Sequence, residues 1–434
     1  MAAPQQNAEA TPEATLGLAE LIAVGVGGMI GGGIFSVLGM AVGIAGHAAP
    51  LAFAIGSLVA LAAGYSYVKL ALGFRSDGAS FTYLEKAFPK RPNVSGIAGW
   101  TVIVGYVGTL ALYAFTFGAY GAHLLGEPGS ATVRMALSAL VLLFFMTVNL
   151  LGTKASGRTE DLIVYTKVIL LAIFVVAGAK TISTDNLSPV FETGITSPLI
   201  AGALIFVAFE GFQLITNAVV ETRCPDKNIP RGIYGSIVIT SLIYVGVAIV
   251  AIGNLDLSTL IGAEEYALSV AAKPALGNAG ELLVDIAALL ATSSAINATL
   301  FGASRMLAEM ATSKRVPQAF HHRTRAAVPW VAVVSMTGLA AAFTLASGLE
   351  TIAAFSSLVF LVVSIAVSIA NYRLREQTKS RVAIIFLGLI LMSTTVALLV
   401  AHLWAHERTT LAWVAGLFAA ISLAEVLFVE RQTL

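Results

Sequence analysis

The stretch Gly25-Val-Gly-Gly-Met-Ile-Gly-Gly-Gly-Ile-Phe35 lies in the middle of the first long apolar segment, residues 16–44. A helix that crosses a bilayer needs about 20 apolar residues, so this segment is long enough to span. Glycine costs about 1 kcal/mol relative to alanine inside a helix, and glycines cluster between Gly27 and Gly33. We therefore expect a spanning helix that is broken near the membrane midplane. Backbone groups freed there must line a cavity or bind something, as in transporters. The alternative is that the glycines only let a neighbouring helix pack closely.

The composition of the whole chain indicates an integral membrane protein built of helices. Of its 434 residues, 57% are hydrophobic and 11% are charged, whereas soluble domains average about 25% charged residues. The apolar runs are continuous rather than alternating, which excludes a transmembrane β-barrel. Residues 1–15 are polar and are expected to form a disordered cytoplasmic tail. The single cysteine, Cys224, excludes an intramolecular disulfide.

Apolar segments follow one another along the chain and predict about twelve transmembrane helices. After residues 16–44, the expected spans are 50–74, 94–125, 133–151, 162–181, 198–220, 233–253, 275–310, 328–346, 352–372, 382–404 and 411–429. Residues 16–181 and 198–372 would form two halves of five helices each, and residues 382–429 would add two further helices. Residues 257–273 carry Glu264 and Glu265 and are expected to form either a short helical hairpin over the outer mouth or an ordinary solvated loop.

Lysine and arginine residues set the expected orientation, because cytoplasmic loops carry an excess of both. Clusters of basic residues follow every second helix, whereas the loops on the opposite side carry only Arg134, Lys180, Lys273 and Arg408. We therefore expect a multi-pass protein of the cell inner (cytoplasmic) membrane, with both termini in the cytoplasm.

The sixth span contains a second candidate interruption. Glu210-Gly211 falls in its middle third, and a carboxylate at the bilayer centre costs at least about 2.5 kcal/mol, so it should face a cavity or a partner. Five spans separate the two interruptions, which is the spacing expected of two five-helix halves of opposite topology. The alternative for Glu210 is a purely structural acid that is satisfied by neighbouring backbone N–H groups.

Four motifs in the same order resemble the amino acid–polyamine–organocation (APC) superfamily of secondary transporters. They are Gly28-Met-Ile-Gly-Gly-Gly-Ile-Phe35; Phe206-Val-Ala-Phe-Glu-Gly-Phe212; Glu221-Thr-Arg-Cys-Pro225 with Ile229-Pro-Arg-Gly232; and Asn297-Ala298, Ser304-Arg305, Met310-Ala311 and Val316-Pro317. The resemblance implies a five-plus-five inverted repeat (LeuT-like), with helices 1 and 6 broken at the midplane, and transport by alternating access. It implies that the substrate lies between the two breaks.

The two breaks define the expected substrate site. The helix half after the first break presents free N–H groups and a positive dipole end, which suit a carboxylate. We assign that role to Gly31, Gly32 and Gly33, and expect freed carbonyls to accept hydrogen bonds from an α-ammonium group. Phe206 or Phe209 would act as an aromatic gate, or would simply pack. The predicted substrate-binding residues are Met29, Ile30, Gly31, Gly32, Gly33, Phe206, Ala208, Phe209 and Glu210.

Lys167 is the predicted proton-coupling residue, with Glu210 as a second candidate. It lies about 9 Å inside the fifth span, counted at 1.5 Å per residue, among apolar neighbours. The alternative is that it extends to the membrane surface. Some members of the family are similar to sodium-coupled relatives but carry a lysine whose ammonium takes the place of the sodium ion. The resemblance implies partners in the carbonyls of Gly27 and Ile30 and the hydroxyls of Ser293 or Ser294.

Taken together, these features predict a proton-coupled, sodium-independent amino acid importer. The substrate class remains open between amino acids and polyamines or other organic amines; the single good acidic candidate, Glu210, favours amino acids. A channel, a membrane enzyme and a nutrient sensor are the rival classes. Asp285 and Glu281 are weaker candidates for a role in transport. No cofactor, metal or nucleic acid partner is expected, and the oligomeric state cannot be read from the sequence.

Overall fold

The computed structural model describes residues 16–76, 78–90, 92–152, 157–314, 316–324 and 328–433. The predicted tail, residues 1–15, lies outside the described residues. In the described part, the only β-type pairing is an isolated bridge between Leu16 and Thr222. The prediction of an all-α protein is therefore confirmed.

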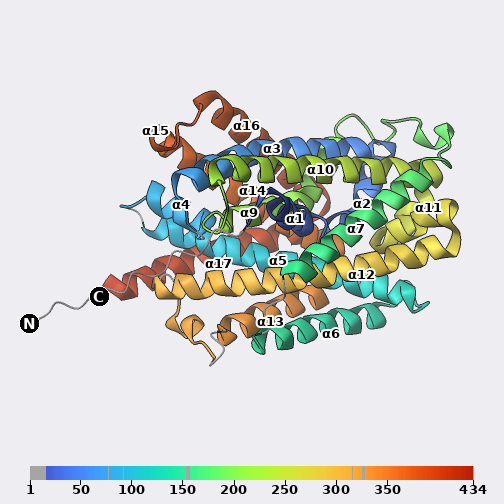
Figure 1. The fold of residues 1–434 in the computed structure, drawn as a ribbon. Helices are drawn as coiled ribbons and strands as arrows, with labels where there is room; N and C mark the ends of the chain where they lie inside the picture. Colours follow the sequence, from blue (N-terminus) through green and yellow to red (C-terminus); the bar gives the residue numbers. More distant parts are fainter. Residues whose placement is uncertain are drawn as a thin grey trace, which may run out of the picture.

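The elements follow one another as α-helices with short 3₁₀ segments, labelled η (Figure 1). They are α1 (Leu18–Met29), α2 (Gly33–Ala45), η1 (Gly46–Ala48), α3 (Ala49–Gly73), α4 (Ala79–Ala87), α5 (Pro92–Leu124), α6 (Ala131–Leu150), α7 (Gly157–Gly178), η2 (Thr184–Leu187), α8 (Ser197–Leu204), η3 (Ile205–Gln213), α9 (Leu214–Asn217), α10 (Pro225–Asn254), α11 (Leu257–Gly262), η4 (Glu264–Tyr266), α12 (Ala267–Thr312), η5 (Gln318–His321), α13 (Trp330–Ala346), α14 (Leu349–Arg373), α15 (Arg375–Thr378), α16 (Val382–His406) and α17 (Arg408–Thr433).

Each predicted span falls on helical residues. In the described part of the chain, eight helical stretches are long and apolar enough to cross a membrane, and four further apolar helices are shorter. The main difference in bounds is α10, which begins at Pro225 rather than near residue 233. Proline is favourable in the first turn of a helix because its missing N–H would have no partner there. With Pro225 in its first turn, the helix can begin in the polar sequence that precedes its apolar part.

The first helix is interrupted as predicted. α1 ends at Met29, residues 30–32 form a turn, and α2 begins at Gly33. The glycines also permit a close crossing: a Cβ added to Gly211 would lie 2.3 Å from the backbone carbonyl carbon of Gly28 and from the amide nitrogen of Met29. The backbones of the two interrupted helices therefore touch at this point.

The interruption of helix 6 takes the form of a long 3₁₀ segment. η3 spans 9 residues between α8 and α9 and includes Glu210. Runs of 3₁₀ helix longer than three or four residues are uncommon and often mark a hinge or a functional segment. Ser357 of α14 stabilises its start, because the hydroxyl accepts a hydrogen bond from the amide of Val207 (2.9 Å) and donates one to the carbonyl of Leu204 (2.5 Å).

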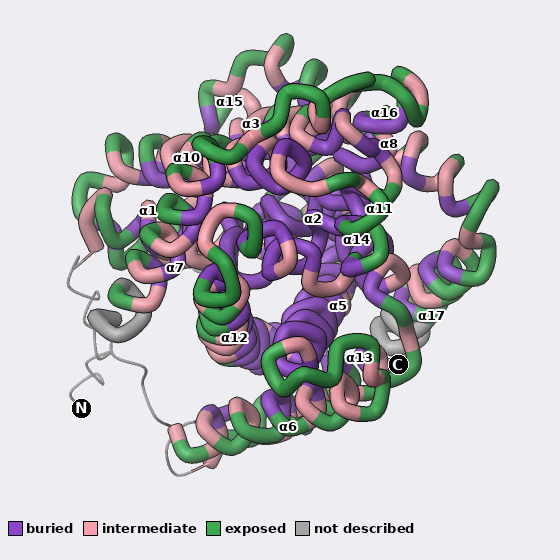
Figure 2. The backbone as a smooth tube through the Cα atoms, turned by 90° about the vertical axis from the view of Figure 1, so that its right-hand side faces the viewer, coloured by how far each residue is buried: buried purple, intermediate pink, exposed green. Residues whose placement is uncertain are grey.

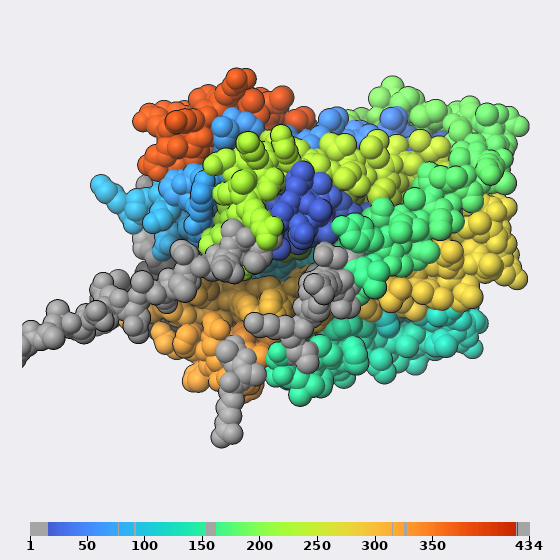
Figure 3. Space-filling view, viewed as in Figure 1, coloured from blue at the N-terminus to red at the C-terminus, as the bar shows by residue number. Residues whose placement is uncertain are grey.

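The core gathers around α2, α5 and η3. Figure 2 shows the buried residues concentrated along α2, α5 and α14, whereas the outer faces of α6, α16 and α17 are exposed. Figure 3 shows α1 at the surface of this view, between α7 and the segment of α9 and α10, and α1 packs against all three. The inner faces of the central helices thus surround the two interruptions.

The two ends of the molecule differ. The short helices α4 and α15 lie at one end, and α11 lies at the other (Figure 1). At the second end, α11, η4 and the start of α12 form a helical hairpin before α12 kinks at Gly277 (φ 63°). A Cβ added to Gly39 of α2 would lie 2.2 Å from the carbonyl oxygen of Glu264. The predicted hairpin therefore exists and packs directly on α2.

The start of α1 is joined to the loop that follows α9. The amide of Leu16 donates to the carbonyl of Glu221 (3.0 Å), and the amide of Arg223 donates to the carbonyl of Leu16 (2.8 Å). The chain ends of the α1 and α9 segments are thus connected by backbone hydrogen bonds, away from their crossing at Gly28 and Gly211.

Candidate functional site

A narrow cavity of about 40 Å³ lies beside the two interruptions. Five segments line it: α1, α5, α7, η3 with the start of α9, and α12. Its lining includes the following residues that could contact a polar ligand or an ion: Gly27, Gly28, Tyr106, Thr109, Tyr113, Lys167, Glu210, Gly211, Ser294 and Thr299. Since the lining comes from α1 and α9 rather than from α2 and α8, the cavity lies on the α4 and α15 side of the breaks.

Lys167 reaches this cavity from α7 and joins three helices. Its side chain is buried, with only 1% exposed, so it does not extend to the surface. Nζ donates to the carbonyl of Gly27 (3.3 Å) and to the hydroxyl of Ser294 (3.2 Å). The structure thus brings together the predicted Lys167, Gly27 and Ser294. Ser293 precedes Ser294 in α12 and is half-buried; its part and that of Ile30 remain predictions.

Glu210 lies in the wall of the same cavity. It is buried, and the hydroxyl of Thr109 in α5 donates to its Oε2 at 3.0 Å. Nearby, the hydroxyl of Tyr113 donates to the carbonyl of Gly28 at 3.2 Å. An acid and a base therefore face one small space, each held by hydrogen bonds to a different helix.

The other predicted substrate-binding residues surround the breaks but do not line the cavity. Met29, Ile30, Gly31, Gly32, Gly33, Phe206, Ala208 and Phe209 are all buried. Around the first break, a Cβ on Gly31 would lie 2.5 Å from that of Ala295, and one on Gly32 would lie 2.3 Å from the ring of Tyr113. Ala295 and Tyr113 therefore pack directly against the break at Gly31 and Gly32.

Tyr244 of α10 occupies the carbonyl of Met29, which with those of Phe206 and Phe209 was expected to receive an ammonium group, and also contacts a carbonyl that was not expected. Its hydroxyl is within hydrogen-bond distance of the carbonyls of Met29 (2.6 Å) and Ala208 (3.2 Å). Phe209 packs edge-on against the same tyrosine, with ring centroids 5.4 Å apart. Because a single water needs about 10–15 Å³, the cavity holds a few waters but no amino acid. Substrate entry therefore requires the elements around the breaks to move apart.

Comparison with known proteins identifies the family of the chain. A family model described as amino acid permease matches residues 16–424. The chain belongs to the amino acid permease family. The chain is similar to an uncharacterized protein of Methanocaldococcus jannaschii, with 33% identity over 95% of both chains. It is also similar to the inner membrane transport protein YbaT of Escherichia coli, with 29% identity over 92% of this chain and 93% of the relative.

A third relative carries a substrate class in its name. The branched-chain amino acid permease BcaP of Bacillus subtilis is 27% identical over 70% of this chain and 68% of its own length. The family model and the Escherichia coli and Bacillus subtilis relatives are described as permeases or transport proteins, so this permease is a transporter and not an enzyme. The recognition of the APC superfamily from four motifs is confirmed.

The contacts at the site that were missed from the sequence are made by hydroxyl groups. Thr109, Tyr113 and Tyr244 bind Glu210, Gly28, Met29 and Ala208 in the permease. A signal for the first two exists, because polar residues recur at helical spacing along α5: Tyr106, Thr109, Tyr113, Thr116, Tyr120 and His123. A weaker signal exists for Tyr244, because Ser236, Thr240 and Tyr244 recur every four residues along α10.

Proposed function

We propose that this secondary transporter imports amino acids by alternating access and couples their entry to protons without sodium. The observation that carries the proposal is the buried Lys167, whose ammonium binds the carbonyl of Gly27 just before the first break and the hydroxyl of Ser294 in α12. A buried ammonium needs such acceptors, because burial alone disfavours the charged form. Protonation of Lys167 would therefore favour the conformer in which α1, α7 and α12 are held together.

Loss of that proton would weaken the link between α1 and its neighbours. A neutral amine makes a weaker hydrogen bond to the buried carbonyl of Gly27 than a charged ammonium does. With this bond weakened, α1 becomes free to move relative to α12. If the two access states differ in these contacts, proton binding and conformation are thermodynamically linked. The ammonium also supplies the positive charge that a sodium ion would otherwise provide.

The proposed substrate is a small zwitterion placed between the breaks. The first turn of α2, at Gly33, offers N–H groups that have no partner inside the helix and suit a carboxylate. The carbonyls of Met29 and Ala208, now bound by Tyr244, would accept the substrate ammonium after that tyrosine moves. Glu210 is the acid nearest to this space. A polyamine would require several acids there, and the name of the Bacillus subtilis relative also favours amino acids.

The permease is proposed to lie in the inner membrane of the cell, with both termini in the cytoplasm. The loops with the predicted excess of lysine and arginine include those around α4 and α15, which lie at one end of the molecule (Figure 1). The cavity then lies on the cytoplasmic side of the breaks, and the hairpin covers α2 on the outer side.

The test is uptake by purified permease in sodium-free proteoliposomes with an acid exterior. We expect labelled amino acids to enter together with protons, read by an internal pH-sensitive dye, and polyamines to compete poorly. Lys167→Ala should lower uptake more than about tenfold, a change of 1.4 kcal/mol or more in the limiting step, while amino acid binding persists. Lys69→Ala is the matched control, because Lys69 Nζ binds only the exposed carbonyl of Lys379 among the bonds described (3.2 Å).

Two results would contradict the proposal. Uptake by Lys167→Ala that is complete and independent of pH would remove the proton role of the lysine. Preferential uptake of polyamines by the unmodified permease would contradict the assignment of amino acids as substrates, but it would not contradict the transport mechanism.

A further inference from the structure

A stripe of polar side chains joins the cavity to the opposite end of α5. Tyr106, Thr109, Tyr113, Thr116, Tyr120 and His123 are separated by steps of three and four residues, which place them on one face of the helix. From the first to the last is about 25 Å at 1.5 Å per residue, most of the roughly 30 Å hydrocarbon thickness. The stripe thus crosses nearly the whole membrane.

Thr109 binds Glu210 in η3, and the next three members of the stripe bind groups on either side of the first interruption. Beyond Thr109 and Tyr113, the hydroxyl of Thr116 shares a hydrogen bond with that of Ser36 (2.5 Å), and the hydroxyl of Tyr120 donates to the carbonyl of Phe35 (3.0 Å). Ser36 in turn donates to the carbonyl of Gly32 (2.6 Å). Polar contacts therefore recur about once per turn along this face, from Glu210, past the break, toward the hairpin end of the molecule.

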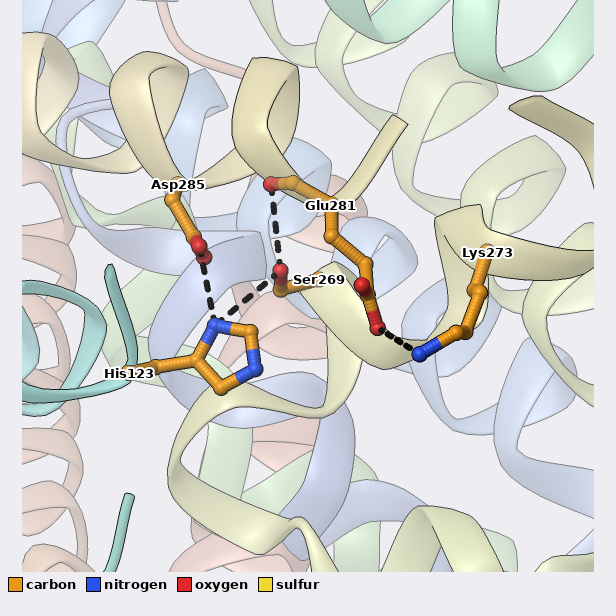
Figure 4. A network of polar contacts seen from close by, with 5 residues as sticks. All are labelled: His123, Ser269, Lys273, Glu281 and Asp285. Atoms are coloured by element: carbon orange, nitrogen blue, oxygen red, sulfur yellow. Dashed lines mark hydrogen bonds and ion pairs between the residues drawn. The ribbon is translucent and has the colours of Figure 1, made fainter. Parts of the chain in front are cut away.

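The stripe ends in a histidine that is paired with a buried acid. His123 Nδ1 lies 2.8 Å from Oδ2 of Asp285 in α12 and 3.5 Å from the hydroxyl of Ser269 (Figure 4). Asp285 is only 2% exposed, and its Oδ1 has no hydrogen-bond partner among the described residues. A buried carboxylate oxygen without a donor is costly. The proposed transport through Lys167 does not use this pair, and no structural need of the fold accounts for the unpartnered oxygen.

The surroundings of His123 attract a proton. Tyr266 of η4 stacks on the imidazole ring, with centroids 4.6 Å apart. Six charged groups lie beside His123 and Tyr266: Asp285, Glu281 and Lys273 from α12, Glu264 and Glu265 from η4, and Arg134 from α6. Within this group, Lys273 pairs with Glu281 at 3.2 Å and Arg134 lies 3.9 Å from Glu265. The acids outnumber the bases, so a cation at His123 is favoured electrostatically.

The same residues adjoin a cavity on the hairpin side of the breaks. This outer cavity has a volume of about 250 Å³ and is lined by Ala119 and Ala122 of α5, Arg134 of α6, and Glu264, Glu265 and Tyr266 of η4. It has room for many waters. The His123 side chain is 16% exposed, and its Nε2 points away from Asp285 (Figure 4). Water can therefore reach the imidazole from one side while the carboxylate holds it from the other.

We propose that His123 and Asp285 form the outer proton-loading pair of the permease. The inference rests on the proposed proton coupling. A proton from outer water binds Nε2 of neutral His123, and the Nδ1–H continues to donate to Asp285. The resulting ion pair holds α5 against α12, and through Tyr266 and Ser269 against the hairpin. When the outer side opens, the hydroxyls of the stripe order the waters that carry the proton to Glu210 and Lys167.

A pH profile resolved by membrane side tests this assignment. Uptake is measured in proteoliposomes with the external and internal pH varied separately, and insertion orientation is scored by labelling the exposed Cys224 with a membrane-impermeant maleimide. We expect His123→Gln to shift the midpoint of the external pH dependence by about one unit or more, a tenfold change in proton affinity. The internal pH dependence and amino acid binding should stay unchanged.

His47→Gln is the matched control. His47 is likewise mostly covered (12% exposed) and lies 3.1 Å from an acid, Glu192, but it is not on the α5 stripe. It should reproduce the external pH profile of the unmodified permease. Asp285→Asn keeps the shape of the carboxylate and provides a second variant with the same expected shift, in case His123→Gln folds poorly.

The outcomes separate this inference from the proposed function. A wild-type external profile in both His123→Gln and Asp285→Asn, with proton entry intact, would overturn the loading pair alone. Equal changes on both sides of the membrane would show a merely structural role and would also overturn it. Uptake without proton entry in the unmodified permease would overturn the proposed function, and the pair with it.

Discussion

Lys167 and Glu210 are both buried beside the same cavity, but they are held in different ways. The lysine binds a backbone carbonyl of α1 and a hydroxyl of α12, so its charge state affects how two helices are joined. The described hydrogen bond of Glu210 comes from the side chain of Thr109. The acid is therefore attached to α5 through a neutral donor, and its carboxyl group lines the cavity that a ligand would enter. We assign the conformational link to the lysine and the substrate-facing role to the acid.

This assignment predicts the effect of Glu210→Gln. The amide oxygen can still accept from Thr109, so the fold should be retained and the thermal unfolding temperature should change little. Without the negative charge, the attraction for a substrate ammonium is lost, and hydrogen bonds to charged groups are worth about 1.5–3 kcal/mol. We expect the apparent affinity for amino acids to fall about tenfold or more, measured by the concentration dependence of uptake.

Glu221→Gln is the control for charge removal. Glu221 is exposed, and its two described hydrogen bonds use the backbone carbonyl and amide rather than the carboxylate. This variant should transport with unchanged affinity. An unchanged affinity in Glu210→Gln as well would contradict the substrate-facing role of Glu210.

Part of this site could be predicted from the sequence and part could not. A lysine and a glutamate inside apolar spans are costly enough to stand out, so Lys167 and Glu210 could be singled out from the sequence itself. The partners Gly27 and Ser294 were expected only from the resemblance to the family, which left Ser293 and Ser294 as alternatives. Tyr113 and Tyr244 were missed because a tyrosine is tolerated in many membrane positions. Only the packing of α5 and α10 against α1 determines which carbonyl each hydroxyl meets, and that packing joins residues far apart in the chain.

At the scale of elements, the crossing of α1 and η3 depends on two glycines. Gly28 and Gly211 let the backbones touch, and any side chain at Gly211 would lie within 2.3 Å of backbone atoms that belong to the other helix. The backbone cannot yield as a flexible side chain would. The two interruptions are therefore kept next to each other by the absence of side chains at one point.

Gly211→Ala should separate the two helices. Overpacking of a tight interface costs about 1–3 kcal/mol, so we expect a lower thermal unfolding temperature and uptake reduced more than about tenfold. Gly43→Ala, in the same pair of interrupted helices, has nothing within 4 Å of the added Cβ. It should leave both measurements near those of the unmodified permease. Normal uptake by Gly211→Ala would show that the close crossing is not needed.

The secondary structure was largely predictable because each span is a continuous apolar run. The form of the helix 6 interruption was not. The segment around Glu210-Gly211 can form either a loop or 3₁₀ turns. The choice depends on which hydrogen-bond donors and acceptors of other helices reach its free backbone groups. Ser357 supplies them from a helix more than a hundred residues later in the sequence. The extension of α10 to Pro225 was missed for a simpler reason, since its first turns are polar and resemble a loop.

At the scale of the whole molecule, the distribution of charged residues and the two cavities distinguish the ends. The proposed orientation predicts which end a water-soluble reagent can reach from outside. Cys224, exposed in the loop before α10, should resist a membrane-impermeant maleimide in intact cells and react after permeabilisation. Gly262→Cys in a Cys224→Ser background should give the reverse result, because Gly262 is exposed in the hairpin at the other end. Labelling of Cys224 in intact cells would invert the proposed topology.

The backbone link from Leu16 to Glu221 and Arg223 has a consequence for how the permease moves. α1 meets η3 at the glycine crossing, and the start of α1 is hydrogen-bonded to the loop after α9. α1 is therefore attached at two points to the segment that runs from η3 through α9. Two segments that are attached at two points move together as one rigid unit. Widening of the cavity would then bend the chain at residues 30–32 and within η3, and it would leave the contact surface between α1 and α9 intact throughout the cycle.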